Sequence, residues 1–191
     1  MSQSHIQIVD MYYKRWLPTH QFSETHFSEI EAKAEDIMRL IQNLDDHDDF
    51  LVRWMLVLRE APSRFWGFFG GKSALNNQPR FGLRNFTLLE KTDSVIVYGL
   101  CGRFWRHDFG LASIKTKENF TEFNQTHLAK LVLMFSITQV DSQSYELRTD
   151  TRIHCNTRSS YVKFFPYWII IRMASGLIRR RILSSIKEKL E

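Results

Sequence analysis

Groups that can move a proton or hold an anion are concentrated in one short stretch, GLCGRFWRHDFG, which runs from Gly99 to Gly110. If this stretch is a strand, alternation places one set of side chains on a common face: Tyr98, Leu100, Gly102, Phe104 and Arg106. With that face turned inward, Arg106 would be a single cation at the edge of an apolar site. Such a cation suits a carboxylate, phosphate or sulfate group. The alternative, that Arg106 pairs with a carboxylate of the sheet, stays open.

Other reactive residues do not form a recognisable catalytic or metal-binding motif. His107 and Asp108 are adjacent, so on a strand they point apart and cannot orient each other. The acidic run from Asp45 to Asp49 contains metal-ligand types, but acidic residues at the start of a helix explain it. Gly70 to Ser73 lacks the spacing of a phosphate-binding loop. We therefore assign no catalytic residue and expect no metal and no cofactor.

Charge and cysteine content restrict the class of protein. The 26 Lys and Arg against 21 Asp and Glu give a net charge of +5, spread along the chain. We therefore expect no nucleic-acid binding, which needs a concentrated basic surface. The one dense run, Arg179 to Arg181, is interpreted as a solvated helix face or a contact for anionic lipid headgroups.

Cys101 and Cys155 have no metal-site spacing, so we expect both to be reduced thiols. The first sixteen residues lack an apolar leader, so we expect a cytoplasmic location.

The hydrophobic pattern predicts a definite order of elements. A strand is expected over 22–32, where Phe22, Phe27 and Ile30 alternate imperfectly with polar residues, followed by helices over 33–44 and 45–61. Strands are then predicted within 81–91, 94–106, 109–115, 129–140 and 144–156, with a helical insert at 117–125. A long amphipathic helix, bent near Pro166 or Gly176, fills 157–191. Residues 1–21 are assigned as an N-terminal extension and 22–191 as a single domain.

This order predicts an α+β fold in which a curved antiparallel sheet wraps around the last helix. Together with the phrases SETHFSEIEAKAEDIMRLI, VIVYGLCGRFWR, LRTDTRI and YWIIIRMASGLIRRRIL, it resembles the START, polyketide cyclase and Bet v-type superfamily of helix-grip proteins, most closely a bacterial branch. The resemblance covers about residues 22–190. It implies a hydrophobic chamber between the sheet and the C-terminal helix.

Alternation along the strands predicts which side chains line that chamber. One face of 129–140 carries Leu133 and Phe135, and the matching face of 144–156 carries Thr149 and Thr151. The full set of expected ligand-binding residues is Tyr98, Phe104, Arg106, Leu133, Phe135, Thr149, Thr151 and Trp168. The other face of the 144–156 strand bears Glu146, Arg148, Asp150, Arg152 and His154, which we expect to face solvent as a charge ladder.

Three functions follow from this interpretation. The first is a binding protein that encloses a hydrophobic or amphipathic small molecule, such as a lipid, a fatty acid or a flat polycyclic compound. The alternative is an enzyme of the cyclase or dehydratase type, which needs an acid or base inside the chamber. A third is lipid handling with transient contact between the arginine run and an anionic membrane surface. The sequence leaves the oligomeric state open.

Overall fold

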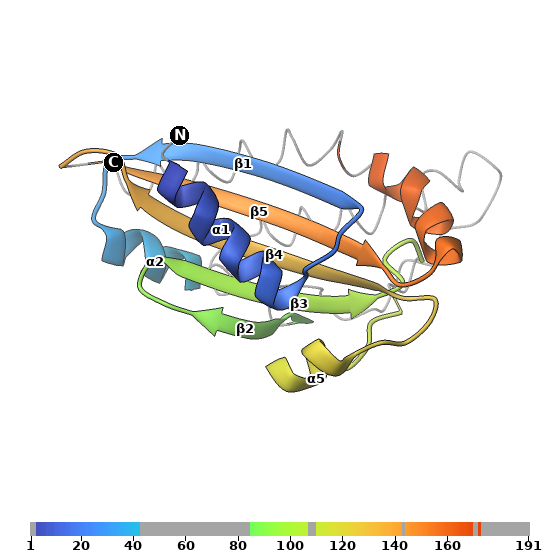
Figure 1. The fold of residues 1–191 in the computed structure, drawn as a ribbon. Coiled ribbons are helices and arrows are strands. Elements are labelled where there is room, and N and C mark those ends of the chain that lie inside the picture. Colours follow the sequence, from blue (N-terminus) through green and yellow to red (C-terminus); the bar gives the residue numbers. More distant parts are fainter. Residues whose placement is uncertain (1–2, 43–84, 107–109, 143, 170–171, 173–191) are drawn as a thin grey trace, which may run out of the picture.

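The computed structural model describes residues 3–42, 85–106, 110–142, 144–169 and 172 (Figure 1). The first half of the described chain contains α1 (Gln3–Trp16), β1 (Phe22–Ile30), α2 (Ala34–Gln42), β2 (Thr87–Lys91) and β3 (Val95–Gly102). The second half contains α5 (Lys117–Glu122), β4 (Ala129–Gln139), β5 (Tyr145–Cys155) and a C-terminal helix over 158–169. Thr157 begins this last helix, since its Oγ1 accepts a hydrogen bond from the Ser160 amide.

The five strands form one antiparallel sheet in the order β1-β5-β4-β3-β2 (Figure 1). Strands β2 to β5 follow one another as a meander, and β1, the first strand in the chain, pairs with β5, the last. The predicted α+β class is therefore confirmed, and the open antiparallel sheet with its C-terminal helix is consistent with a helix-grip fold.

Several predicted elements differ from the structure or lie outside it. The strand expected over 94–106 ends at Gly102, and the next residues form a turn in which the Arg106 amide donates to the Arg103 carbonyl. Residues 110–115, part of the strand expected at 109–115, have no regular structure. The helix expected at 45–61 with its aspartate cluster, the pair His107 and Asp108, and the chain after 172 all lie outside the described residues.

The inner face of the sheet is defined here as the face that carries Ile96, Leu133 and Thr149. Helix α2 packs at one end of this face, where Ile37 and Ile41 join a buried cluster with the strands. Its apolar residues recur three and four apart, as the sequence predicts for a helix with one buried side. The helix 158–169 packs at the other end through Phe164.

The outer face of the sheet is covered by α1, which crosses the strands in Figure 1. Val9, Tyr13 and Trp16 of α1 are buried in a cluster with outward side chains such as Val97 and Met134. Much of the segment assigned as an extension therefore forms one layer of the core. Its burial removes apolar area from water at both the helix and the sheet.

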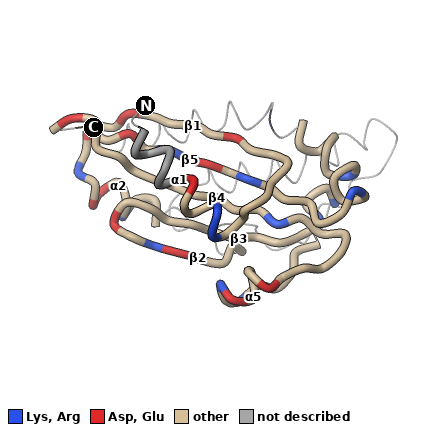
Figure 2. The backbone as a smooth tube through the Cα atoms, viewed as in Figure 1, with Lys and Arg blue, Asp and Glu red and all other residues tan. Residues whose placement is uncertain are grey.

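Charged residues are unevenly distributed among the strands. Lys, Arg, Asp and Glu positions occur along β1, β2 and β5, whereas β3 carries none and β4 carries only Lys130 (Figure 2). Strand β3 and strand β4, with its single lysine, lie next to each other in the sheet. The central strands therefore offer an apolar surface, and the polar groups lie to its sides.

Candidate functional site

Five of the eight predicted binding residues lie together on the inner face, in two neighbouring cross-strand rows. In the first row Tyr98 of β3 pairs with Leu133 of β4, and Leu133 pairs with Thr151 of β5. Thr151 in turn pairs with Glu24 of β1. Because paired residues of an antiparallel sheet project from the same face, this row runs from an aromatic ring to a carboxylate.

The second row lies two residues further along each strand. Ile96 of β3 pairs with Phe135 of β4, and Phe135 pairs with Thr149 of β5. Thr149 pairs with His26 of β1. The inner face thus has an apolar centre on β3 and β4 and a polar side on β5 and β1.

Glu24 and His26 form a hydrogen-bonded pair on the polar side. The Nε2 atom of His26 lies 2.7 Å from Oε1 of Glu24, and the side chains are 19% and 9% exposed respectively. Strand geometry brings them together, since residues two apart on one strand share a face. Because a carboxylate only accepts hydrogen bonds, Nε2 of His26 donates to Glu24, and Nδ1 is the other polar atom of the ring. We call these two residues the Glu24–His26 pair.

Thr149 places a buried hydroxyl beside this pair. Its side chain is on the inner face, the residue is 3% exposed, and no hydrogen-bond partner for Oγ1 is found among the described residues. Buried polar groups are normally hydrogen-bonded, so the missing partner of Thr149 calls for an explanation. The hydroxyl is both a donor and an acceptor.

Phe104 and Trp168 lie at the other end of the inner face, in a packed aromatic cluster. The Phe164 ring is at its centre, 6.4 Å from the Phe104 centroid and 6.1 Å from that of Trp168. Both predicted residues are buried there together with Leu100 and Ile153. This end of the face is filled by side chains of the C-terminal helix.

Arg106 does not occupy the position that the sequence analysis gave it. It lies in the turn after β3 and is exposed, so the alternation of β3 does not place it at the inner face. The prediction of a strand through Arg106 was wrong because Gly102 ends the ladder and a backbone hydrogen bond closes the turn. Strand alternation instead delivers the Glu24–His26 pair to the inner face.

A side groove of about 460 Å³ lies between the start of β1 and the C-terminal helix. It is lined by Gln21, Phe22, Tyr161, Phe165, Trp168, Ile169 and Arg172. Trp168 thus has one edge at this groove while the rest of its ring packs against Phe22 and Phe164. The side groove is open to solvent and is separate from the two rows on the inner face.

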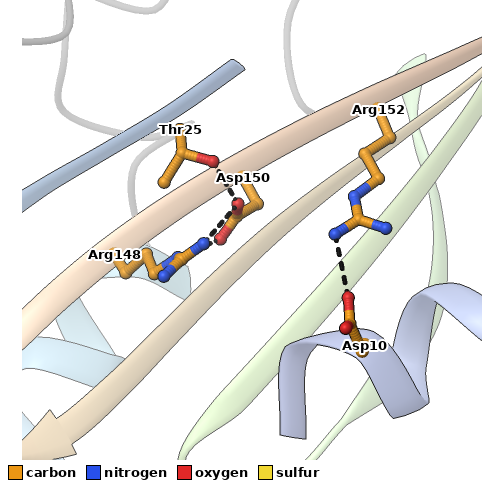
Figure 3. A network of polar contacts seen from close by, with 5 residues as sticks. All are labelled: Asp10, Thr25, Arg148, Asp150 and Arg152. Atoms are coloured by element: carbon orange, nitrogen blue, oxygen red, sulfur yellow. Dashed lines mark hydrogen bonds and ion pairs between the residues drawn. The ribbon is translucent and has the colours of Figure 1, made fainter. Parts of the chain in front are cut away.

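Two of the five side chains of the expected charge ladder on the outer face of β5 are buried and the other three are only partly exposed, which corrects that expectation. Arg148 and Asp150 are 8% and 2% exposed, and Arg148 Nε lies 2.6 Å from Asp150 Oδ2 (Figure 3). Asp150 also accepts from Thr25 Oγ1. Arg152 binds Asp10 of α1 at 3.1 Å. The ladder was misjudged because α1 covers this face, which alternation within one strand cannot reveal.

Arg152 is held between α1 and the sheet by two contacts. Besides its ion pair with Asp10, its guanidinium lies 3.9 Å from the ring centroid of Tyr13. A cation over an aromatic face is attracted by the ring quadrupole. We therefore assign Arg148, Asp150 and Arg152 to the attachment of α1 and β1 to the sheet, not to a binding site.

Both cysteines are free thiols and are buried on opposite faces of the sheet. Burial raises the pKa of the Cys101 and Cys155 thiols to about 12. Reactivity depends on the thiolate, which is scarce at neutral pH for such groups. Within the described ranges no three His, Cys, Asp or Glu side chains come together as metal ligands.

Sequence reasoning missed the Glu24–His26 pair because of Phe27. The apolar pattern of 22–32 included Phe27 with Phe22 and Ile30, but Phe27 is 58% exposed on the outer face. The strict two-residue period from Phe22 to Ile30 passes through Glu24, His26 and Ser28. This two-residue period was the sequence signal that could have placed Glu24 and His26 on the inner face.

Two solved structures resemble this chain distantly. Searches of family models and of curated proteins find no match to this sequence. A hypothetical protein of Helicobacter pylori is 9% identical with a TM-score of 0.38, over 93% of this chain and 94% of its own. BexL, a di-domain ARO/CYC protein of the BE-7585A biosynthetic pathway, is 10% identical with a TM-score of 0.38, over 89% of this chain and 50% of its own.

The chain thus spans about half the length of BexL. At these identities and TM-scores neither match assigns the chain to a family or a function. None of the helices that the structure describes has the length and apolar character needed to span a bilayer. The function must therefore be argued from the residues of the inner face.

Proposed function

We propose that the protein binds a hydrophobic or amphipathic small molecule against the inner face of the sheet. The observation that carries this proposal is the buried Thr149 hydroxyl, which has no partner among the described residues. A buried polar group without a hydrogen bond costs about 1–3 kcal/mol. A bound molecule with a polar group at this position removes that cost.

The surroundings of Thr149 favour a ligand that is mainly apolar. Its neighbours across β4 and β3 are Phe135 and Ile96, and the adjacent row contributes Leu133 and Tyr98. Tyr98 is only partly buried, and its ring packs edge-on against the apolar rings of Phe86 and Phe135. Binding sites for small molecules typically combine such surface with few polar groups that fix orientation.

Thr149→Val tests the proposal without a large change of shape. We expect the free energy of unfolding to rise by about 1 kcal/mol in the absence of ligand, because an unsatisfied buried hydroxyl is removed. The same substitution should weaken binding of decan-1-ol about fivefold, because one hydrogen bond to the ligand is lost. Urea denaturation measures the first quantity and titration calorimetry the second.

Thr87→Val is the matched control for this experiment. Thr87 is also a buried strand threonine, but its Oγ1 donates to the Ile114 carbonyl at 2.6 Å on the outer face. We expect this variant to lose about 1 kcal/mol of stability and to bind decan-1-ol as the wild type does. Equal destabilisation by both substitutions would mean that Thr149 has a partner in the folded chain, and the proposal would lose its main support.

The Glu24–His26 pair favours one second candidate, an enzyme of the cyclase or dehydratase type. An enzyme of this type needs an acid or a base inside its apolar site, and the His26 ring is such a group. In such a reaction the His26 ring takes a proton from carbon, the C–H electron pair moves to form an enolate on a neighbouring carbonyl, and Glu24 orients the ring and stabilises its positive charge. General base catalysis of this kind contributes about 10²–10⁴-fold in rate.

Deuterium exchange into 2-tetralone, a flat ring ketone, tests this second candidate. The wild type in D₂O should accelerate exchange next to the carbonyl, and His26→Gln should lower the enzyme-catalysed rate at least about 100-fold. His154→Gln is the control, because His154 lies on the outer face of β5 and contacts Thr19. If the wild type exchanges no faster than buffer, the enzymatic alternative is wrong for this class of ketone.

A further inference from the structure

The C-terminal helix over 158–169 is apolar on its exposed side as well as on its buried side. The buried side packs against the sheet through the aromatic cluster around Phe164. The exposed side carries four large apolar side chains: Tyr161, Val162, Phe165 and Ile169. We call these four residues the exposed stripe. Within the part of the chain that the structure describes, half of the large apolar side chains that are exposed belong to this stripe.

Helical spacing brings the exposed stripe together on one face. Tyr161, Phe165 and Ile169 follow one another at intervals of four residues. Val162 precedes Phe165 by three residues, and side chains three or four apart are neighbours on a helix surface. The other exposed apolar side chains occur singly, on α1, β1, β2 and the turn after β4. Single exposed apolar residues are normal on a protein surface, whereas a contiguous patch marks a site of interaction.

The helix cannot pack both of its sides against the sheet. Phe164 is 1% exposed and fixes the orientation of the helix, whereas Val162 is 60% exposed and Phe165 44% exposed. A helix with apolar residues on both sides is normally surrounded by a protein core or by lipid. The exposed stripe therefore favours a second apolar environment outside the folded chain.

The charges beside the exposed stripe are all of one sign. The helix carries two charged residues, Arg158 and Lys163, both exposed, and it has no Asp or Glu (Figure 2). In the sequence no acidic residue occurs between Asp150 and Glu188. Asp150 itself is buried in its ion pair with Arg148 and does not offset these charges. A partner that covers the stripe therefore meets an apolar surface with positive charge at its margin.

We propose that the exposed stripe is a docking surface for an anionic lipid bilayer. The four apolar side chains lie at the boundary between headgroups and acyl chains, and Arg158 and Lys163 contact the lipid phosphates. Helices with aromatic and aliphatic residues on one face and basic residues beside them bind membranes in this orientation. Each basic residue near an anionic surface strengthens binding about fivefold. This surface is separate from the inner face, and the inference does not depend on the proposed function.

A second copy of the chain fits the exposed stripe less well than a bilayer does. Two stripes in contact would bring together two helices that carry only basic charges. Like charges that face each other across an interface oppose association. An anionic bilayer offers the opposite charge together with an apolar layer.

Sedimentation of the full chain with lipid vesicles tests the proposal. The vesicles contain either phosphatidylcholine alone or equal parts of phosphatidylcholine and phosphatidylglycerol. We expect the wild type to bind the anionic vesicles at least about tenfold more tightly than the neutral ones. This difference should decrease at high salt, because ions screen exposed charges. The double variants Val162→Ser, Phe165→Ser and Arg158→Gln, Lys163→Gln should each weaken binding to anionic vesicles at least about tenfold.

Two variants with similar changes elsewhere on the surface are the controls. Lys115→Gln, Lys117→Gln removes the same amount of charge beside and within α5, and Met11→Ser removes an exposed apolar side chain from α1. Both should bind anionic vesicles as the wild type does, because neither position belongs to the docking surface. Far-ultraviolet circular dichroism checks that every variant is folded.

The wild type and the two double variants decide the outcome. If the wild type does not sediment with anionic vesicles, the docking surface is wrong, while binding at the inner face is unaffected. Equal binding to neutral and anionic vesicles would contradict the role of Arg158 and Lys163. If both double variants bind as the wild type does, another surface such as the run from Arg179 to Arg181 holds the vesicle, and the inference is overturned. The charge variant decides this point alone if the stripe variant does not fold.

Discussion

Replacement of Phe164 by alanine is expected to lower the free energy of unfolding by about 4 kcal/mol. The Phe164 side chain is 1% exposed and its ring contacts those of Phe22, Phe104, Tyr167 and Trp168. Removal of a buried phenylalanine ring costs about 3–5 kcal/mol, because transfer energy is lost and a cavity is left. Urea denaturation followed by far-ultraviolet circular dichroism measures the change.

Phe165→Ala provides the control on the next residue of the same helix. Phe165 is half-exposed at the side groove and contacts Tyr161 at a centroid distance of 6.0 Å. We expect this variant to lose no more than about 1 kcal/mol, since partly exposed side chains bury less area. Similar losses for the two variants would contradict the packing of helix 158–169 against the inner face.

Replacement of Asp150 by leucine is expected to cost about 4 kcal/mol. The Arg148 guanidinium donates to both oxygens of Asp150, at 2.6 and 3.1 Å, and Thr25 donates to the same carboxylate. Removing one partner of a buried ion pair leaves an uncompensated charge and costs about 3–5 kcal/mol. Thermal and urea unfolding of the variant would report this loss.

The double variant Arg148→Met, Asp150→Leu separates a buried unpaired charge from a simple loss of packing. Replacement of both members of a buried ion pair by apolar side chains is often neutral or stabilising. We therefore expect the double variant to recover most of the stability that Asp150→Leu loses. A double variant as unstable as the single one would show that the pair is not the source of the effect.

Most of the fold was predictable because its elements follow simple periods. The two-residue alternation of 129–140 and 144–156 predicted β4, β5 and the shared inner face of Leu133, Phe135, Thr149 and Thr151. The three-to-four spacing of Ile37, Leu40 and Ile41 predicted α2. Periodicity succeeds where one side of an element is buried along its whole length.

The parts of the fold that were predicted wrongly depend on contacts that a local sequence pattern does not contain. The aromatic residues after Gly102 extend the strand pattern, but a turn closed by the Arg103 carbonyl ends β3 before Arg106. The outer face that carries Arg148 and Asp150 is covered by α1, which lies more than a hundred residues away in the sequence. Local alternation contains no information about such a covering layer.

The candidate site was predicted in its apolar part and missed in its polar part. Tyr98, Leu133 and Phe135 followed from alternation, whereas the imperfect alternation of Phe22, Phe27 and Ile30 assigned no inward face to β1. The register between β1 and β5 is what places Glu24 and His26 beside Thr151 and Thr149. Pairing between the first and last strands is set by the whole fold and not by either strand alone.

The most direct test of the central claim is to map the ligand by nuclear magnetic resonance, titrating ¹⁵N-labelled protein with decan-1-ol. Binding at the inner face predicts that the largest amide shifts occur at Glu24, His26, Tyr98, Thr149 and Thr151. Residues of the side groove, such as Tyr161 and Phe165, should shift much less. Largest shifts at the side groove, with the inner-face rows unchanged, would contradict the account.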